Sequence, residues 1–316
     1  MGDALNMPRV FVVALPAAGL VAAGLLAGGC AAKEVPAFSA DSALVHVEHQ
    51  VALGPRVPGS PARDAAARYL ARTLERHGAS VSLQAFEVDD PYRPGRLRLI
   101  NIMGSFAPDR GRRLMLAAHY DSRPWADQEA DSTLWTTPIP GAVDGAVSTG
   151  ILLEVARVVG ARLPADIGVD VVLFDGEDYG KEGDLQYYLL GSQGFVARAA
   201  GYRPVAAILL DMVGGRGTRV QQEGFSRQRA PALVDFVFGR AAALGLDYFE
   251  PVEGTPVYDD HVPLLQAGYP AIDLFGYGYG AWHTLGDDLD QVDAARVADV
   301  GTLLQSIIYD FSYPAR

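Results

Sequence analysis

The chain has 316 residues, of which 49% are hydrophobic and 20% are charged, so it can bury a full core and extensive disorder is not expected. It carries 38 acidic and 26 basic residues, and the net charge of −12 disfavours a surface that neutralises nucleic-acid phosphates. The single cysteine excludes an intrachain disulfide framework and a cluster of cysteine zinc ligands. We therefore expect a globular protein with no nucleic-acid partner.

The first thirty residues have the features of an export signal. Residues 10–29 carry no charge and follow Arg9, and small residues crowd the end of this run before Cys30. The stretch 26–30, Leu-Ala-Gly-Gly-Cys, resembles a bacterial lipobox with its leucine one place early, in which the cysteine is lipidated. The alternative is a retained membrane-spanning helix, since the run is long enough to cross a bilayer.

These features predict a lipoprotein-type signal peptide over 1–30, a tether over 31–40, and a single catalytic domain over 41–316. The mature protein is then an exported lipoprotein, anchored by the lipid on Cys30 to a membrane, with the domain in the periplasm or at the cell surface. We expect it to be a monomer.

Apolar residues recur at helical spacing in some segments, such as 61–77, and alternate or run continuously in others, such as 81–86. In chain order the pattern predicts helices over 45–51 and 61–77, strands over 81–86, 97–106 and 113–118, a helix over 146–159, a strand over 169–174, a helix over 193–200, a strand over 205–210, a helix over 230–244, a strand over 270–275 and a closing helix over 292–311. This alternation predicts an α/β fold: one domain with a mostly parallel twisted sheet and helices on both faces. Ligands of such sheets bind beyond the carboxyl ends of the strands.

Polar residues follow several of these strands. His119 comes directly after the strand that ends at Ala118 and is followed by Asp121. His119 is either a metal ligand that Asp121 orients or a histidine satisfied within a capped loop, and this motif alone does not separate the two.

The acidic cluster after the most hydrophobic strand carries more information. Asp175, Glu177 and Asp178 follow Phe174 within four residues. Crowded carboxylates repel one another unless a cation or a shared proton relieves them. One of these acids can therefore ligate a metal while its neighbour transfers protons.

Four further motifs have both a structural and a functional interpretation. Asp144 precedes the helix over 146–159 and by itself is best explained as an N-cap, whereas Asp211 ends a strand and suits a capped turn equally well. The cluster 259–261 is either a solvated helix start or part of a site, and Trp282 with His283, after a glycine- and tyrosine-rich loop, suggests a pocket. A set of two imidazoles and three carboxylates from separate strand ends or loops suits zinc: His119, Asp144, Asp178, Asp211 and His283.

With these residues in view, the chain from about Val45 to the C-terminus resembles the zinc exopeptidase family that contains aminopeptidases and animal-type glutaminyl cyclases. If it is an aminopeptidase, the resemblance implies two zinc ions held by those five residues and makes Glu177 the general base. If it is a cyclase, the resemblance implies a single zinc ion.

The cyclase branch is favoured by four stretches that resemble their cyclase counterparts: 54–60, 119–122, 259–263 and 282–284. That resemblance implies the following roles: Asp144, Asp178 and His283 as ligands of a single zinc ion; Glu177 as proton shuttle; Asp211 and Asp259 in its hydrogen-bond network; and Trp282 and Asp273 as substrate-binding residues. His119 and Asp211 are candidates for a second metal site if the chain is an aminopeptidase. Asp178 stands where many relatives have glutamate, and Asp273 stands where animal cyclases carry histidine.

The expected function is therefore a zinc-dependent glutaminyl-peptide cyclotransferase that converts the N-terminal glutamine of peptides to pyroglutamate and releases ammonia. The alternative is a zinc aminopeptidase that releases N-terminal residues. A non-catalytic peptide-binding lipoprotein is a third hypothesis, which an intact set of acids and histidines disfavours. In each case the expected partner is a peptide with a free N-terminus.

Overall fold

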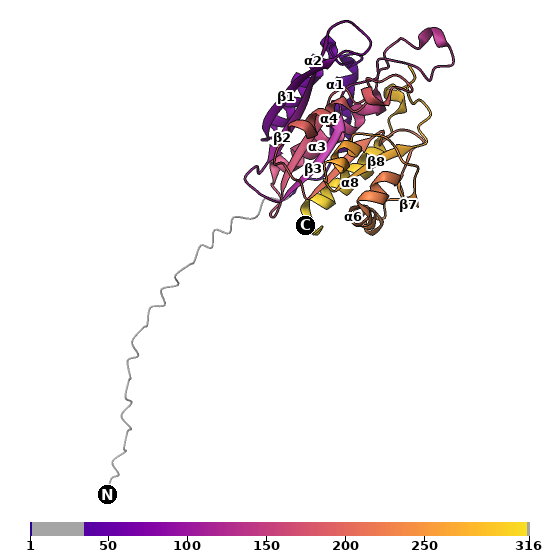
Figure 1. Ribbon diagram of the computed structural model, residues 1–316. Helices are drawn as coiled ribbons and strands as arrows, with labels where there is room; N and C mark the ends of the chain where they lie inside the picture. The colour runs from indigo at the N-terminus through magenta and orange to yellow at the C-terminus, as the bar shows by residue number, and fades with distance from the viewer. Residues whose placement is uncertain (2–34, 315–316) are drawn as a thin grey trace. The chain divides into compact units, whose positions relative to one another are not determined.

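The strands of the domain form one eight-stranded sheet with the order β1-β2-β4-β3-β5-β8-β6-β7. Figure 1 labels the outer strands β1 and β7 and several strands between them. The computed structural model describes Met1 and residues 35–314, so the predicted signal peptide and Cys30 lie outside the described residues. The strand bounds are β1 Ser80–Asp89, β2 Arg96–Phe106, β3 Arg113–His119, β4 Gly168–Phe174, β5 Ala206–Asp211, β6 Arg219–Gln222, β7 Phe249–Glu253 and β8 Ala271–Tyr277.

The centre of the sheet is parallel and its margins are mixed. The neighbouring strands β4, β3, β5 and β8 all run in the same direction. On one side β1 and β2 form a long antiparallel pair that joins β4, and on the other side β6 runs antiparallel to β8 and parallel to β7. The prediction of a mostly parallel sheet in one α/β domain is confirmed.

Helices cover the sheet in two groups. The bounds are α1 Ala40–Ala52, α2 Pro61–Arg76, α3 Ser148–Ala161, α4 Leu190–Arg198, α5 Gly224–Arg229, α6 Pro231–Ala243, α7 His261–Gln266 and α8 Ala294–Tyr309. In one group α1, α3 and α8 pack on one another, and α3 packs on β3 and β4. In the other group α4 packs on α7, and these two helices contact β2, β5 and β8.

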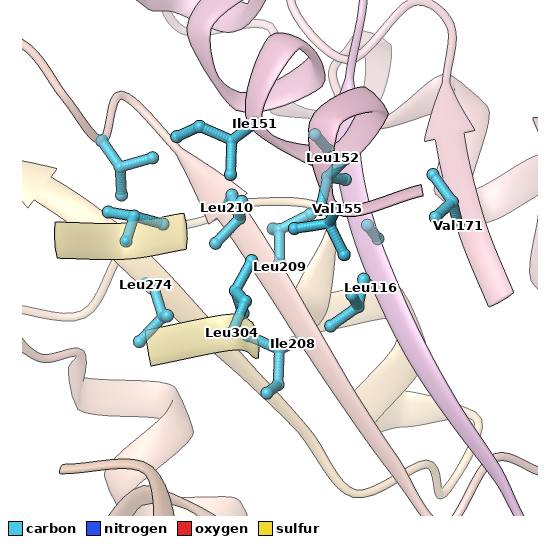
Figure 2. Close-up of a cluster of buried hydrophobic side chains, with 14 of the residues drawn as sticks. Leu116, Ile151, Leu152, Val155, Val171, Ile208, Leu209, Leu210, Leu274 and Leu304 are labelled. Carbon is cyan, nitrogen blue, oxygen red and sulfur yellow. The ribbon is translucent and has the colours of Figure 1, made fainter. Parts of the chain in front are cut away.

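The main core lies between the central strands and the helices α3 and α8, as Figure 2 shows. Its members are aliphatic and fully or almost fully buried: Leu116, Val171, Ile208, Leu210 and Leu274 from the strands, with Ile151, Leu152, Val155 and Leu304 from the helices. Burying a side chain of this size stabilises the fold by about 1.5–3 kcal/mol. The core therefore holds the central parallel strands in fixed register, and the carboxyl ends of those strands position the polar residues.

The packed domain begins before residue 41, so it includes the last residues of the predicted tether over 31–40. Helix α1 begins at Ala40, and the Ser39 hydroxyl caps it by accepting from the Ser42 N–H at 3.2 Å. The Phe38 N–H donates to Gln305 Oε1 on α8 at 2.8 Å, and the Phe38 ring covers Gly301, where a Cβ would lie 2.2 Å from it. The last residues of the expected tether therefore pack on α8.

Strands β6 and β7 were not among the predicted elements. In β6 only Val220 is fully buried, and most of β7 is half-buried or exposed, so neither segment shows the apolar alternation that marks a strand. Strand β6 is formed by pairing with β8, and β7 by pairing with β6. Within the described part of the chain, no helix is both long and apolar enough to cross a membrane.

Candidate active site

The polar residues gather where adjacent parallel strands end. His119 is the last residue of β3 and Asp211 the last of β5, while residues 175–178 follow β4. Because β4, β3 and β5 are neighbours and run in the same direction, these three chain segments lie side by side at one edge of the sheet.

Asp144 reaches this edge from the irregular helical segment Ala142–Val147 that leads into α3. The Asp287 carboxylate holds this segment by accepting from the N–H groups of Val143, at 2.9 Å, and Asp144, at 3.3 Å. Gly145 is required here, since a Cβ would lie 2.5 Å from the Nε2 atom of His119. The segment therefore packs directly on His119, and Asp144 is 4% exposed. The simple N-cap interpretation of Asp144 does not describe its position.

Asp144, Asp178 and His283 form a buried triad with ligand atoms within 4.8 Å of one another. The Nε2 atom of His283 lies 3.5 Å from Asp178 Oδ1 and 3.8 Å from Asp144 Oδ2. The opposite ring nitrogen of His283 lies 3.6 Å from Asp127 Oδ1. A carboxylate behind a histidine is the usual arrangement that orients a metal-ligating imidazole.

Two residues of this arrangement, Arg123 and Asp127, were not singled out in the sequence. The Arg123 guanidinium is 1% exposed and donates to Asp178 Oδ1 at 2.6 Å, to both Asp127 oxygens at 2.9 and 2.5 Å, and to the Tyr188 hydroxyl at 2.9 Å. It therefore locks Asp178 and the carboxylate behind His283 in place. The only sequence signal is proximity, since Arg123 lies four residues after His119 and resembles any loop arginine.

A second triad shares Asp144 with the first. The Nε2 atom of His119 lies 3.1 Å from Asp144 Oδ1 and 3.2 Å from Asp211 Oδ1. Its Nδ1 atom lies 3.5 Å from Asp121 Oδ1, and Asp121 also accepts from the N–H groups of Glu177 and Asp178 at 3.2 and 3.3 Å. Asp121 therefore connects the β3 loop to the β4 loop and faces the imidazole that it was predicted to orient.

Glu177 lines a cavity of about 100 Å³ together with both triads' carboxylates and His283. Burial and the neighbouring Asp178 raise the pKa of Glu177 well above its usual range. Burial also raises the pKa of Asp178 to about 6, although Arg123 and His283 oppose that shift. A carboxyl with a raised pKa in such a cavity suits proton transfer near neutral pH.

Trp282 forms the wall between this cavity and a larger one. Its ring lies against the His283 ring with centroids 3.9 Å apart and the two planes tilted by 30°, and the residue is 44% exposed. The second cavity has a volume of about 730 Å³ and shares Tyr188, Tyr258, Phe275, Trp282 and His283 with the first. The small cavity therefore adjoins a wider one, and most of the residues that they share are aromatic.

The remaining predicted site residues, Asp259 and Asp273, occupy different positions. Asp259 is 3% exposed and lines the small cavity. Asp273 lies on β8, is 1% exposed and sits behind Asp259, next to the imidazole of His261. This position under the cavity floor does not support the substrate contact that the resemblance implied. His261 itself is fully buried, so the cluster 259–261 is not a solvated helix start.

The residues of the first triad fit a zinc ion. Two carboxylates and one imidazole are a donor set that zinc accepts in catalytic sites, with a further position left for water or substrate. Within residues 35–314 the Oδ2 atom of Asp178 is buried and has no hydrogen-bond partner. A cation between the three side chains would satisfy this oxygen and relieve the repulsion among the acids of the cavity.

Comparisons with known proteins agree with this arrangement. The model of the family described as Peptidase family M28 matches residues 101–308. The chain is 26% identical over 291 residues to a glutaminyl-peptide cyclotransferase of Boiga dendrophila, covering 81% of this chain and 77% of that protein.

Two solved structures are closer in sequence. A glutaminyl cyclase of Tannerella forsythia superposes with a TM-score of 0.83 at 40% identity, covering 87% of this chain and 99% of that one. A Zn-dependent exopeptidase of Parabacteroides distasonis superposes with a TM-score of 0.84 at 36% identity, covering 88% and 100%. The family model spans most of the domain and includes both triads, and on this ground the chain belongs to peptidase family M28.

Proposed function

We propose that this chain is a zinc-dependent glutaminyl-peptide cyclotransferase, which converts the N-terminal glutamine of peptides to pyroglutamate with release of ammonia. The observation that carries the proposal is the position of Glu177, a carboxyl of raised pKa in the same small cavity as the Asp144–Asp178–His283 triad. The likeness to glutaminyl cyclases supports the same activity.

Asp144, Asp178 and His283 would hold the zinc ion, and Arg123 and Asp127 would keep two of these ligands oriented. When bound, zinc supplies a Lewis acid that polarises the side-chain amide carbonyl of the substrate and stabilises the negative charge that develops on its oxygen. Family M28 and its Zn-dependent relatives support zinc as the metal.

Glu177 moves the proton. The α-amine of the substrate attacks its own side-chain amide carbon, a new C–N bond closes the five-membered lactam, and the original amide C–N bond breaks. Glu177 takes the proton from the attacking amine and delivers it to the departing nitrogen, which leaves as ammonia. A free α-amine has a pKa of about 7.7–8.0, so a neutral fraction that can attack exists near pH 7–8.

Because the nucleophile belongs to the substrate, the enzyme accelerates the reaction chiefly by orienting the amine toward the amide. Holding amine and amide in a reactive geometry contributes up to roughly 7–11 kcal/mol in favourable cases. The small cavity provides this confinement for the glutamine, and Asp211 and Asp259 line it beside Glu177. The residues that follow the glutamine would lie in the larger aromatic cavity beyond Trp282.

One observation favours a second candidate, a zinc aminopeptidase. His119, Asp144 and Asp211 form a second triad with ligand atoms within 4.8 Å, so the site offers donors for two ions that share Asp144. A peptidase needs a water nucleophile, whereas the cyclase uses the substrate amine. The likeness to a Zn-dependent exopeptidase supports this alternative.

Product analysis separates the two activities. The purified protein is incubated with a glutaminyl peptide and with the matching leucyl peptide, and ammonia and free amino acids are measured. The cyclase produces ammonia and a pyroglutamyl peptide from the first substrate and leaves the second intact. Release of free leucine or glutamine without ammonia would replace this proposal with the aminopeptidase, and two zinc ions per chain would support that outcome.

We also propose that the protein is exported, lipidated on Cys30 and anchored to a membrane in the periplasm or at the cell surface, as a monomer. The composition of residues 10–30 supports export. Mass analysis of the protein from its native membrane tests this proposal. A diacylated N-terminal cysteine is expected, and the variant Cys30→Ser should keep an unprocessed leader. Light scattering of the domain tests its oligomeric state.

A further inference from the structure

A buried polar chain extends from the floor of the small cavity into the domain, and no step of the proposed reaction uses its inner part. It contains Asp259, Asp273, His261 and Glu223, which are all 3% exposed or less. The nearest ligand atoms of Asp259, His261 and Asp273 lie within 4.8 Å of one another. Buried polar groups that are not fully hydrogen-bonded are costly, so a group of this size calls for a functional explanation.

Glu223 is the fixed end of this chain. It caps α5: its Oε1 atom accepts from the N–H groups of Phe225, at 2.8 Å, and Val257, at 2.9 Å, while its Oε2 atom accepts from the N–H and hydroxyl of Ser226, at 2.7 and 2.6 Å. Four donors hold both oxygens as an ionised carboxylate. Burial alone would raise the pKa of Glu223, but His261 and Ser226 lower it to about 2.

His261 connects Glu223 to the carboxyls under the cavity. Its Nε2 atom lies 3.0 Å from Glu223 Oε2, and its Nδ1 atom lies 3.8 Å from Asp273 Oδ2. Within the described residues, the Oδ2 atom of Asp259, both side-chain oxygens of Asp273 and both ring nitrogens of His261 are buried without a well-aligned hydrogen bond, so the imidazole and the carboxylates meet as close contacts in a buried cluster. These carboxyls therefore depend on each other and on the imidazole for their orientation.

From this geometry we infer that His261, held by Glu223, is a positioning residue for the reaction: it acts through Asp273 to keep the Asp259 carboxyl aimed into the small cavity beside Glu177. The inference rests on the proposed function, because it assigns the cavity that contains Asp259 to catalysis. It also gives Asp273 a role that fits its burial. None of these residues belongs to the Asp144–Asp178–His283 triad.

Two replacements of His261 separate this role from a structural one. Asparagine places its amide near the position of Nδ1, and glutamine places its amide near the position of Nε2. His261→Asn therefore keeps the contact toward Asp273 and loses the one to Glu223, whereas His261→Gln does the reverse. Because the contact to Glu223 is the shorter of the two, His261→Gln should have the higher melting temperature.

The expected kinetic order is the opposite of the stability order. We expect kcat to fall about tenfold or more in His261→Gln and less in His261→Asn, with KM and zinc content unchanged in both. The kcat of Asp273→Asn should equal that of His261→Gln. The kcat of the double variant should be no lower than that of its slower parent, because both substitutions remove the same contact between His261 and Asp273. Leu264→Ala, a core change on the same helix α7, is the control, and should lower the melting temperature without changing kcat per zinc-bound chain.

Either of two results overturns the inference: unchanged kcat in both His261 variants, or kcat values that follow the melting temperatures. Failure of the proposed function is separate and is seen in the wild type, which would then release no ammonia. If the wild type instead releases free amino acids, kcat for that release is measured in the same variants and compared in the same way.

Discussion

At the scale of single residues, the site depends on how neighbouring groups set the state of each carboxyl. Glu177 and Asp178 are consecutive in the chain, but only Asp178 has a buried arginine bonded to it, since Arg123 donates to its Oδ1 atom. Burial and the adjacent Asp178 raise the pKa of Glu177 well above its usual range. The two acids therefore suit different tasks, Asp178 as a metal ligand and Glu177 as a proton carrier.

Replacing Glu177 by glutamine tests this division. Glu177→Gln keeps the shape of the side chain but removes its capacity to carry a proton, so we expect kcat to fall by about 10²–10⁴. Zinc content and the melting temperature should stay at wild-type values. Glu250→Gln, on the exposed strand β7, is the control and should be fully active. A Glu177→Gln enzyme with normal turnover would exclude Glu177 as the proton shuttle.

Replacing His283 by alanine tests the metal site. His283 contributes the only imidazole of the Asp144–Asp178–His283 triad, so His283→Ala should lose most of its bound zinc and its activity. Metal analysis of the dialysed protein measures this directly. His49→Ala, a change at the end of α1, should retain zinc. If His283→Ala bound as much zinc as the wild type, the ligand assignment would fail.

At the scale of elements, loops attached to rigid strands form the pocket. The loop after β8 brings Trp282 against the His283 ring and between the two cavities. A wall residue of this kind binds substrate equally in the ground and transition states, so its loss raises KM more than it changes kcat.

The variant Trp282→Ala tests this expectation. We expect KM for a glutaminyl peptide to rise by about threefold to tenfold, with zinc content unchanged, and Leu163→Ala, an exposed change before β4, to have no effect. Steady-state kinetics with one peptide over a range of concentrations gives both constants. An unaltered KM in Trp282→Ala would show that this ring does not contact the substrate.

The packing of α1 on α2 gives a pH-dependent contribution to stability. His46 Nδ1 lies 2.6 Å from the Tyr69 hydroxyl, and burial, with a smaller effect of His77, lowers the pKa of His46 to about 4 from about 6.5. Between these values the unfolded chain binds the proton and the folded chain does not, so this site destabilises the fold as the pH falls from 6.5 to 4.

Unfolding measurements on wild type and His46→Gln at pH 7 and at pH 4.5 test this contribution. The free energy of unfolding of the wild type should fall relative to that of the variant as the pH is lowered. The comparison cancels every other titrating group that the two proteins share. Parallel losses in the two proteins would show that His46 titrates normally in the fold.

Elements with a clear apolar periodicity were predictable from the sequence. Elements that form only because they pair with a neighbouring strand were not. The central strands are continuous apolar runs, because both of their faces are buried, and their order brought His119, Asp178 and Asp211 to one edge. Strands β6 and β7 are short, with one buried residue each, so no pattern marks them. Arg123 and Asp287 escaped prediction for a related reason: the contacts that tie them to the site, from Arg123 to Asp178 and from Asp144 to Asp287, join residues far apart in the sequence.

At the scale of the whole molecule, the fold separates stability from chemistry. The apolar core lies between the helices and the middle of the sheet (Figure 2). The charged groups of the site collect at the carboxyl ends of the parallel strands. The cost of burying several like charges at that edge is offset by cations, the Arg123 guanidinium and the metal that the triad is suited to hold. Removing the metal should therefore abolish the activity and lower the stability of the domain, while the apolar core keeps the fold.

The measurement that tests this account most directly is ammonia release from a glutaminyl peptide by the zinc-loaded protein, by the chelated protein, and by the chelated protein after zinc is restored. The account predicts ammonia and a pyroglutamyl peptide in the first sample, neither product in the second, and recovery in the third, with an unchanged circular dichroism spectrum throughout. Ammonia release that persists after complete removal of zinc, or a zinc-loaded protein that releases none, would contradict it.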